Sequence, residues 1–399
     1  MSWEKKTLDQ LGSISRGKSK HRPRNDPKLF CGQYPFIQTS DVKNANFYIT
    51  EYSETYNEAG LAQSKLWDVG TLCITIAANI ADTGILGIPA CFPDSVMGFI
   101  PYDGVSDVRF VKYCFDLLQR DCKQISQGTA QDNLSWQKLS TIEFPAPPIE
   151  TQHRIANILS AYDDLIENNR KQIKLLEEAA QRLYKEWFVD LRFPGHEYTK
   201  IVDGVPEGWE FFRFSDKVKI MSGGTPKTDN SNYYGGKIPF YTPKDSDGAF
   251  FAFQTETNIT EEGLDNCNSH LYPENTIIIT ARGTVGKTTL LAVPMAMNQS
   301  CYALKSDEIN APYYLFFALN QEIIALRTMS NGGVFDTIIV KTFDRIHIRI
   351  PSDNLIQRFE NMVTSIMELI KAKMKENFAL SEARDRLLPK LMGGEVEVW

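Results

Sequence analysis

Two stretches of the chain carry the heptad spacing of apolar residues that is typical of long helices packed against each other. Over residues 155–187 apolar side chains recur in alternating steps of four and three, interrupted by the polar Asn169. Residues 359–391 repeat this spacing, with a polar middle that includes Lys373. Because a helix of about 33 residues is roughly 50 Å long, one small domain would not cover it. We therefore predict that the two helices pair, with Asn169 and Lys373 helping to set the register. The alternative is that each helix packs only on its own domain.

The segment before each predicted helix alternates short β-branched runs with turn-forming residues. Residues 71–76 and 276–280 are such runs, and segments rich in Gly, Asn and Asp separate them from their neighbours. Prolines at 145–148 and at 351 close these segments, and the pattern then becomes helical. The predicted division is a mixed domain over 1–147, a helical segment over 148–195, a second mixed domain over 196–351 and a helical segment over 352–399.

The two halves of the chain repeat each other with an offset of 204 residues. Residues 34–41 align with residues 238–245, and the same offset pairs Arg154 with Arg358. A helix whose partner is its own duplicate is expected to pair antiparallel, in a chain that folds with pseudo-two-fold symmetry. The predicted fold class is therefore α/β (α+β), with two tandem domains, each followed by a long helix, and an antiparallel coiled coil formed by the two helices.

Composition and charge limit the classes of protein to which the chain can belong. The chain has 43 Lys and Arg against 50 Asp and Glu, a net charge of −7, so its surface is not uniformly basic. Seven cysteines, without a Cys-x-x-Cys pair, suit the reduced thiols of a cytoplasmic protein. The N-terminus lacks the apolar region of a signal peptide, and no run reaches the ~18 apolar residues of a membrane span. We expect a cytoplasmic protein with no membrane partner.

Positive charge is concentrated locally, within residues 16–28. Six cations in this segment face only one acid, Asp26, and two prolines interrupt it. Such a segment is typical of a loop that reaches phosphates and base edges, although a solvated surface loop is the alternative. The matching segment in the second half, residues 222–230, is polar and much less charged. Its threonines and asparagine can contact bases without charge, and its lysine can contact a phosphate.

Several motifs suggest chemistry, but each departs from its pattern. Residues 281–288 nearly match a phosphate-binding loop, yet Ala281 replaces the first glycine, and the counterpart in the first half lacks both Gly and Lys. Residues 310–313 are similar to the Asn-Pro-Pro-Tyr motif of amino-methyltransferases, which Ala311 breaks. The histidines show no metal-ligand spacing, and Asp163-Asp164 is interpreted as a solvated helix face. We predict no catalytic residue, no metal site and no cofactor held by this chain.

Taken together, the motifs resemble the specificity (S) subunits of Type I restriction-modification enzymes. The resemblance covers the whole chain and rests on residues 34–41 and their repeat, 78–83, 127–129, 144–152, 281–287 and 387–395. It implies two target-recognition domains at opposite ends of an antiparallel helical pair, each reading one half of a split site in double-stranded DNA. It also implies two methylation (M) subunits that carry S-adenosylmethionine, and restriction (R) subunits that carry ATP and Mg²⁺, with no active site in the S subunit itself.

Side-chain chemistry in the predicted loops supplies the candidate DNA-binding residues. They are Arg16, Lys18, Lys20, Arg22, Arg24, Gln38, Ser40, Gln131 and Asn133 in the first half, and Thr225, Lys227, Lys244, Arg282, Lys287 and Lys341 in the second. The two halves differ most over residues 16–33 and 222–237, so we expect different half-sites and an asymmetric target. Because the chain is acidic overall, we expect it to bind DNA weakly by itself.

Two other functions remain open at this point. One is a coiled-coil scaffold with two protein-binding domains that does not read DNA. The other is a nucleotide-dependent enzyme centred on Lys287, which predicts that the chain alone binds ATP. Joint substitution of the four cations at positions 18, 20, 22 and 24 separates the scaffold from the DNA reader, because a scaffold keeps its partners whereas a DNA reader loses a half-site.

Overall fold

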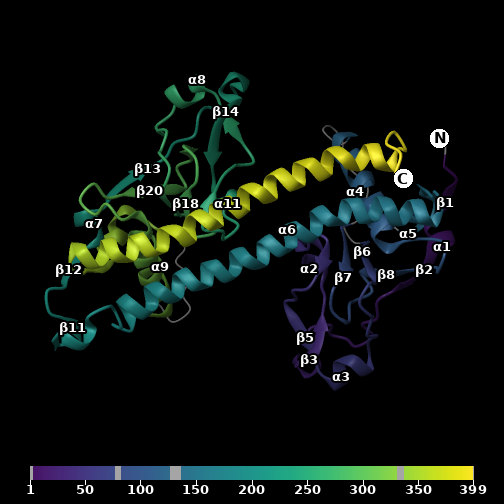
Figure 1. Cartoon of the computed structure of the whole chain (residues 1–399), viewed down its shortest axis with the longest axis horizontal. Coiled ribbons are helices and arrows are strands. Elements are labelled where there is room, and N and C mark those ends of the chain that lie inside the picture. The colour runs from purple at the N-terminus through teal and green to yellow at the C-terminus, as the bar shows by residue number, and fades with distance from the viewer. Residues whose placement is uncertain (1–2, 77–81, 126–135, 330–336, 399) are drawn as a thin grey trace. The chain divides into compact units, whose positions relative to one another are not determined.

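The computed structural model describes residues 3–76, 82–125, 136–329 and 337–398. The chain divides into two compact units: unit 1 comprises Met1–Asn169 and Glu376–Trp399, and unit 2 comprises Arg170–Lys375. The two long helices, α6 (Ile149–Tyr184) and α11 (Asp353–Met392), each contribute one segment to both units (Figure 1). Each unit therefore joins one sheet-based domain to parts of both helices. In the part of the chain that the structure describes, no helix has the length and apolar character needed to cross a membrane.

Unit 1 is built on a five-stranded sheet with the order β2-β8-β6-β7-β4. Its pairs are antiparallel except β4 with β7, which are parallel. The strands of the unit are β1 (Lys5–Thr7), β2 (Gly12–Arg16), β3 (Phe30–Phe36), β4 (Tyr48–Ile49), β5 (Glu54–Tyr56), β6 (Leu72–Thr75), β7 (Thr83–Leu86), β8 (Val96–Pro101) and β9 (Glu143–Pro145). Its shorter helices are α1 (Leu8–Leu11), α2 (Thr39–Asn44), α3 (Glu58–Ala62), α4 (Val108–Ile125) and α5 (Trp136–Leu139).

Unit 2 contains the equivalent five-stranded sheet, with the order β13-β20-β17-β18-β15. Its strands are β10 (Ile201–Val202), β11 (Val205–Pro206), β12 (Glu210–Arg213), β13 (Lys219–Ser222), β14 (Tyr234–Tyr241), β15 (Phe251–Ala252), β16 (Asn258–Ile259), β17 (Ile277–Thr280), β18 (Thr288–Leu291), β19 (Ala296–Met297), β20 (Cys301–Lys305) and β21 (His347–Ile350). Its shorter helices are α7 (Phe214–Lys217), α8 (Glu261–Asp265), α9 (Pro312–Met329) and α10 (Val340–Phe343).

The two units repeat each other in their five-stranded sheets and main helices. Helices α9, α10 and α11 begin 204 residues after α4, α5 and α6, and the strands of the two sheets follow in the same order. In each unit an N-terminal strand pairs with the strand that leads into the long helix: β1 with β9, and β12 with β21. The prediction of two tandem mixed domains, each followed by a long helix, is confirmed.

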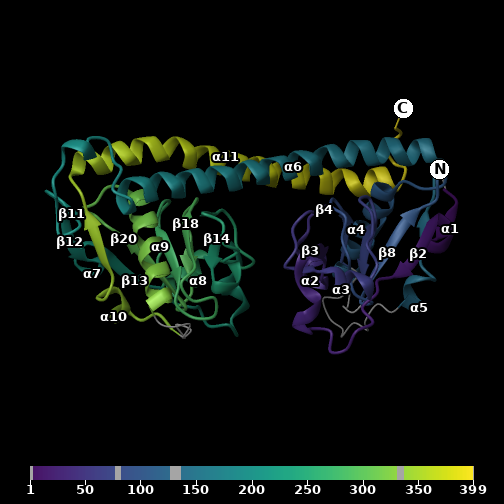
Figure 2. The same ribbon diagram turned by 90° about the horizontal axis from the view of Figure 1, so that it is seen from below.

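In unit 1, α4 lies between the sheet and the long helices (Figure 2). Phe110 on α4 shares a buried cluster with Phe99 of the sheet, and the same cluster includes Leu159 of α6 and Leu391 of α11. Apolar burial of this kind stabilises a fold by roughly 25 cal/mol per Å² of surface removed from water. The domain is thus held by its own helix and by the helix of the other repeat. The predicted pairing of the two helices is confirmed, and the alternative, in which each helix packs only on its own domain, is wrong.

The core of unit 2 is rich in aromatic rings that join α9 to the two long helices. Tyr184 of α6 and Phe317 of α9 have ring centroids 5.8 Å apart, and Phe359 of α11 lies 5.9 Å from Tyr184. Phe188, in the π-helical turn that follows α6, lies edge-on to Phe359 at 5.1 Å. Stacked and edge-on aromatic pairs at these separations stabilise a core beyond the area that they bury. The C-terminal part of α6 is therefore anchored in this domain through rings.

The long helices run antiparallel where they meet in unit 1. Asn169 donates hydrogen bonds to Glu376 (2.9 Å) and Asn377 (3.0 Å), and Asp163, six residues earlier on α6, meets Arg384, further along α11. Residue numbers thus rise on one helix as they fall on the other. Asn169 is 4% exposed, so the predicted polar position in the stripe lies inside the helical contact. A buried asparagine that finds a partner in only one alignment favours that register.

The interpretation of Asp163 as part of a solvated helix face was wrong. Asp163 is 1% exposed; it accepts a 2.5 Å hydrogen bond from the Tyr113 hydroxyl and a further one from the Arg384 guanidinium. Its neighbour Asp164 is exposed, as predicted. The heptad pattern of two helices places Asp163 beside the stripe, but α4 packs over that flank as a third helix. The carboxylate is therefore enclosed between α4 and α11.

Residues 310–313, which are similar to an amine-binding motif, form the N-terminus of α9. The Glu360 carboxylate of α11 accepts hydrogen bonds from the amides of Tyr313 (3.1 Å) and Tyr314 (3.0 Å). In unit 1 the N-terminal amides of α4 are instead held by Asp107, whose position in the repeat is occupied by Ala311. Unpaired amides at a helix N-terminus need an acceptor. Glu360 supplies it from another helix, so this segment has a capping role.

Glu360 should make the stability of unit 2 depend on pH. Burial raises its pKa from 4.5 to about 7, against the lowering effect of the two amides. Between these values the folded chain binds more protons than the unfolded chain, so the free energy of unfolding falls as pH rises through the window. From pH 5 to pH 8 we expect the wild type to lose roughly 2–3 kcal/mol more of its free energy of unfolding than Glu360→Gln, which still accepts a hydrogen bond. Urea unfolding at each pH, monitored by hydrogen exchange of the α9 amides, measures this difference in the free energy of unfolding. An equal pH dependence of the two proteins would contradict the prediction.

Candidate nucleic-acid interface

The basic segment of unit 1 leaves the end of β2 as an extended chain. Arg16, Lys18 and Lys20 are exposed, whereas the intervening Gly17 and Ser19 are buried. Because side chains of an extended chain alternate between its two sides, the three cations lie on one outer side. We call residues 17–26 loop 1. Its regular alternation presents a row of positive charge to solvent at the end of the sheet.

Gly17 fixes loop 1 against the segment that precedes β8. A Cβ atom at Gly17 would lie 2.3 Å from the carbonyl oxygen of Phe92 and 2.4 Å from that of Pro93. The amide of Gly17 donates to the carbonyl of Val96 (2.9 Å), and the amide of Lys18 donates to that of Phe92 (3.1 Å). This close approach of two backbones requires glycine. The start of loop 1 is consequently rigid.

A second segment, after α3, holds the middle of loop 1. The side-chain oxygen of Gln63 accepts hydrogen bonds from the amides of Lys20 (2.6 Å) and His21 (3.0 Å), and the Ser64 hydroxyl donates to the carbonyl of Lys18 (2.8 Å). These bonds occupy the backbone of the loop rather than its charged groups. The lysine ammonium groups remain exposed, which suits contact with phosphate.

The two arginines of loop 1 converge on one carboxylate, that of Asp94. Nη2 of Arg24 lies 2.7 and 2.9 Å from the two oxygens of Asp94, and the guanidinium of Arg22 lies 3.9 Å from it. Arg22 also donates to the carbonyl of Ser19 (2.6 Å). Both guanidinium groups are at least half exposed. They are therefore oriented by the protein and still accessible to a ligand.

A further ion pair closes the end of loop 1. Nε2 of His21 lies 2.8 Å from Asp26, and the amide of Lys28 together with His21 lowers the pKa of the Asp26 carboxyl. An ionised Asp26 turns its charge toward the loop backbone and His21. The single acid of the segment is thereby engaged inside the loop, so the exposed charge of loop 1 is positive.

Gln38 and Ser40 lie beside loop 1, at the start of α2. The amide of Ile37 donates to the carbonyl of Cys91 (2.8 Å), so the 91–94 segment runs between loop 1 and this helix. The Gln38 side chain donates to Glu54 (2.6 Å), whereas Ser40 is exposed. The structure thus brings together seven of the nine candidates of the first repeat. Gln131 and Asn133 lie outside the described residues.

Unit 2 places its corresponding loop in the same way. We call residues 223–233, between β13 and β14, loop 2. A Cβ atom at Gly223 would lie 2.3 Å from the carbonyl oxygens of both Met297 and Asn298, which repeats the close approach made by Gly17. The Thr225 hydroxyl donates to the side-chain oxygen of Gln299, and Lys227 is exposed. Loop 2 is held as firmly as loop 1 but carries less charge.

Lys244 and Arg282 meet at an open depression of about 430 Å³ beside loop 2. Both side chains are exposed, and Asn298, next to Gln299, also lines the depression. The lining residues are Thr242, Pro243, Lys244, Glu256, Thr257, Arg282, Gly283, Asn298 and Ser300. Its two cations outnumber its single acid, Glu256, and with the neutral donors and acceptors around them they can hold a phosphate and contact a base edge. This depression therefore extends the surface of loop 2.

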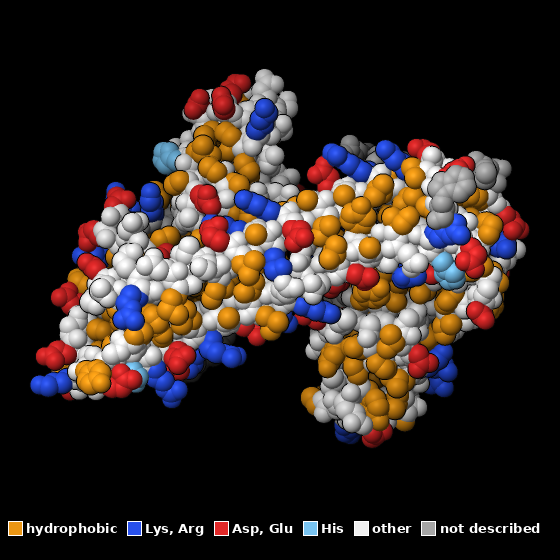
Figure 3. Space-filling model, in the orientation of Figure 1, with side chains coloured by type: hydrophobic (Ala, Val, Ile, Leu, Met, Phe, Trp, Pro, Cys, Tyr) orange, Lys and Arg blue, Asp and Glu red, His pale blue; other side chains and the backbone are white. Residues whose placement is uncertain are grey.

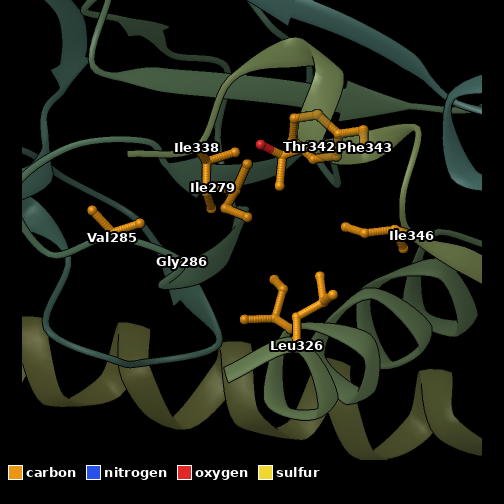
Figure 4. Close-up of a pocket in the computed structure, with 9 residues that line it drawn as sticks. Ile279, Val285, Gly286, Leu326, Ile338, Thr342, Phe343 and Ile346 are labelled. Atoms are coloured by element: carbon orange, nitrogen blue, oxygen red, sulfur yellow. The ribbon is translucent and has the colours of Figure 1, made fainter. Parts of the chain in front are cut away.

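The structure argues against a nucleotide site at Lys287. A phosphate-binding loop leads from a strand into a helix, but residues 281–287 join the antiparallel strands β17 and β18. The Lys287 ammonium donates to the carbonyl of Ser246 (3.0 Å). Val285 and Gly286 line a small apolar cavity of about 20 Å³ that faces Ile338 and Leu326 (Figure 4), a space for one water molecule and too small for a phosphate. This geometry disfavours the alternative of a nucleotide-dependent enzyme centred on Lys287.

Lys341, the last candidate, is exposed on α10. The chain just before it is tied to the turn after β17, because the amide of Ile338 donates to the carbonyl of Ala281 (2.9 Å). Sequence reasoning missed Asp94, Gln63 and Gln299, which hold the candidate residues from other segments of the chain. Within the described ranges, no group of three or more His, Cys, Asp or Glu side chains could hold a metal ion.

Comparison with known proteins agrees with this architecture. Residues 1–178 and 206–375 match the family described as Type I restriction modification DNA specificity domain. The chain is 28% identical to the Type I restriction enzyme MjaIX specificity subunit of Methanocaldococcus jannaschii, over 99% of this chain and 94% of that one. It is 27% identical to the HindI specificity subunit of Haemophilus influenzae, over 97% and 98%.

A solved structure shares the fold. The S subunit of a Type I restriction-modification system from M. genitalium superposes with a TM-score of 0.58 at 18% sequence identity, covering 98% of this chain and 96% of that one. The family match spans both repeats, and each repeat contains the glycine-fixed loop described above. The chain therefore belongs to the Type I restriction-modification DNA specificity family and is a specificity subunit.

Proposed function

We propose that this chain reads a bipartite, asymmetric DNA target, with one half-site contacted by each sheet-based domain. The observation that carries the proposal is that loop 1 and loop 2 are fixed at the same place in the two repeats but present different side chains. Gly17 and Gly223 make equivalent close approaches, whereas loop 1 is strongly basic and loop 2 is largely neutral. Equivalent placement with different chemistry suits two domains that read different sequences in the same manner.

The side chains on each loop suggest how the half-sites are contacted. In loop 1, Lys18 and Lys20 are placed to hold phosphates, while the planar guanidinium groups of Arg22 and Arg24 suit the O6 and N7 acceptors of guanine. In unit 2, Lys244 and Arg282 would supply the charge, and Thr225 a hydroxyl contact to a base. The second half-site would thus be held by fewer cations. Its recognition should be less sensitive to salt.

The exposed faces of the long helices suit the docking of methylation subunits. Soluble surfaces seldom expose apolar residues in rows, but Ile158 and Leu165 are exposed on α6, and Met362 and Leu369 are exposed at the equivalent positions of α11. Hydrophobic side chains are visible along both helices (Figure 3). Because the surface occurs twice, it would bind two copies of one partner. We propose two methylation subunits, with restriction subunits completing the complex.

Catalysis would reside in these partner subunits. S-adenosylmethionine would supply the methyl group from the methylation subunits, and ATP with Mg²⁺ would drive the restriction subunits. This chain would contribute binding and orientation: its loops fix the DNA, and its helices hold the partners. Its own net charge of −7 leaves the partners to supply part of the electrostatic attraction to DNA.

The proposal predicts a defined pattern of methylation in a host that has none of its own. Co-expression of the chain with its methylation subunit should modify adenines within a single motif, formed by two different half-sites and an unspecified spacer of constant length. Genome-wide mapping of modified adenines measures this. The control is the methylation subunit expressed alone, which should leave the genome unmodified. A stable complex that binds S-adenosylmethionine but modifies no site would contradict DNA reading and favour the scaffold.

A further inference from the structure

One side chain contacts the reading loop from the same position in each repeat. Asp94 lies two residues before β8, and Gln299 lies two residues before the equivalent strand β20. Asp94 holds Arg24 in loop 1 through bonds of 2.7 and 2.9 Å, and Gln299 accepts a hydrogen bond from the Thr225 hydroxyl in loop 2. The chemistry differs between the repeats, but the position and the direction of the contact are the same.

The backbone explains why this position reaches the loop in both units. Gly17 presses loop 1 onto the carbonyls of residues 92 and 93, and Gly223 presses loop 2 onto those of residues 297 and 298. The next side chain along the segment is that of residue 94 in the first repeat and 299 in the second. It therefore emerges beside the loop, at a distance set by two closely packed backbones. Any residue at this position meets the side chains that the loop presents.

We propose that Asp94 and Gln299 are positioning residues that set base discrimination, one for each half-site. This inference rests on the proposed reading of a bipartite target. Neither residue needs to touch DNA. Each restricts the orientation of a loop side chain that does, and this restriction decides which base edge fits.

For Asp94 the restricted group is a guanidinium. Its carboxylate engages Nη2 of Arg24 and draws Arg22 to 3.9 Å, which fixes the plane of Arg24 and offsets part of the loop's charge. A guanidinium has five N–H donors, so one engaged nitrogen leaves donors for a bidentate contact with guanine. Without the carboxylate, both arginines are free to move toward phosphates, which carry no sequence information.

For Gln299 the restricted group is a hydroxyl. The single proton of Thr225 is committed to the Gln299 oxygen, so the oxygen that Thr225 presents acts as an acceptor. An acceptor pairs with the exocyclic amino group of cytosine or adenine and rejects the carbonyl acceptors of guanine and thymine. Removing Gln299 frees the hydroxyl to donate or accept, and this should weaken discrimination at that base.

The test is a comparison of four complexes, each formed by the full chain with its methylation subunit: wild type, Asp94→Asn, Asp103→Asn and Gln299→Ala. Asp103 is the matched control, because it is an exposed acid at the other end of β8 and its substitution changes the net charge equally. Modified adenines are mapped genome-wide, and the ratio of cognate to single-mismatch modification is computed for each half-site. The affinity for unrelated DNA is measured as a function of salt concentration, and thermal unfolding confirms that each variant is folded.

We expect Asp94→Asn to lower discrimination in the first half-site about tenfold and leave the second unchanged. Its binding to unrelated DNA should strengthen, with a steeper salt dependence by about one phosphate contact. Gln299→Ala should lower discrimination only in the second half-site, and Asp103→Asn should match wild type. Suppose that wild type modifies a bipartite motif, but that Asp94→Asn and Gln299→Ala discriminate as well as wild type at both half-sites. The inference is then wrong, whereas the proposed function is retained. If wild type modifies no motif, both the inference and the proposed function are wrong.

Discussion

Substituting Gln for Lys18, Lys20, Arg22 and Arg24 together should abolish recognition of the first half-site. These exposed cations carry most of the charge of loop 1, so their loss removes both the proposed guanine contacts and the phosphate contacts. In complex with the methylation subunit we expect affinity for the bipartite target to fall on the order of a hundredfold or more, with a salt slope shallower by about three. Fluorescence anisotropy titrations at several salt concentrations measure both quantities.

A charge-matched control separates recognition from bulk electrostatics. Lys200, Lys217, Lys219 and Lys305 lie on unit 2, and the last three lie at the end of the β13–β20 pair away from loop 2. Their joint replacement by Gln removes the same charge and should change affinity less than about threefold. Retained methylation of the complete motif by the loop 1 variant would refute the assignment of loop 1.

Replacing Asp163 by Ala should destabilise unit 1 by about 3 kcal/mol. The substitution strips the Arg384 guanidinium of its buried partner and leaves the Tyr113 hydroxyl without its acceptor. Breaking a buried pair by removing one member typically costs about 3–5 kcal/mol, and the second contact of Arg384, with Asp385 at 2.8 Å, places the expected value at the lower end. Urea unfolding of the full chain, followed by hydrogen exchange in α4, reports on this unit.

The adjacent aspartate is the control for this substitution. Asp164 has the same charge and lies on the same turn of α6 but is exposed, so Asp164→Ala should change the free energy of unfolding by less than about 1 kcal/mol. Exchange in α9, which belongs to unit 2, should stay unchanged in both variants. Equal stabilities of the Asp163 and Asp164 variants would show that the triad of Tyr113, Asp163 and Arg384 contributes little.

The architecture was predictable because it depends on the spacing of residues along the chain. The 204-residue repeat and the two apolar stripes needed only the spacing of residues, and α6 and α11 begin within two residues of the predicted helical segments. Gly17 and Gly223 are matched glycines of the two halves, at an offset of 206 residues, and in the structure both lie where a Cβ atom would strike a carbonyl oxygen. Stripes and repeats are detectable because burial on a regular helix recurs with a fixed period.

Side-chain contacts between residues far apart in the sequence were not predictable. Nothing in the sequence links Arg24 to Asp94, Lys20 to Gln63 or Thr225 to Gln299, because each pair is brought together only when a loop closes on a distant segment. The partial phosphate-loop match could not be resolved from the sequence for a related reason: the residues at 281–287 allow a turn, but only the pairing of β17 with β18 decides that a strand follows it.

By itself, the sequence determined the duplicated fold, the two long helices and the different chemistry of loop 1 and loop 2. These properties depend on local periodicity and on composition. Only the tertiary structure decided that Asp163 is enclosed, that Glu360 caps α9 in place of an acid at position 311, and that Asp94 and Gln299 contact loop 1 and loop 2. The physical reason is that burial and hydrogen bonding depend on which surfaces meet in space, and a third helix or a distant loop can cover a residue that its own segment leaves exposed.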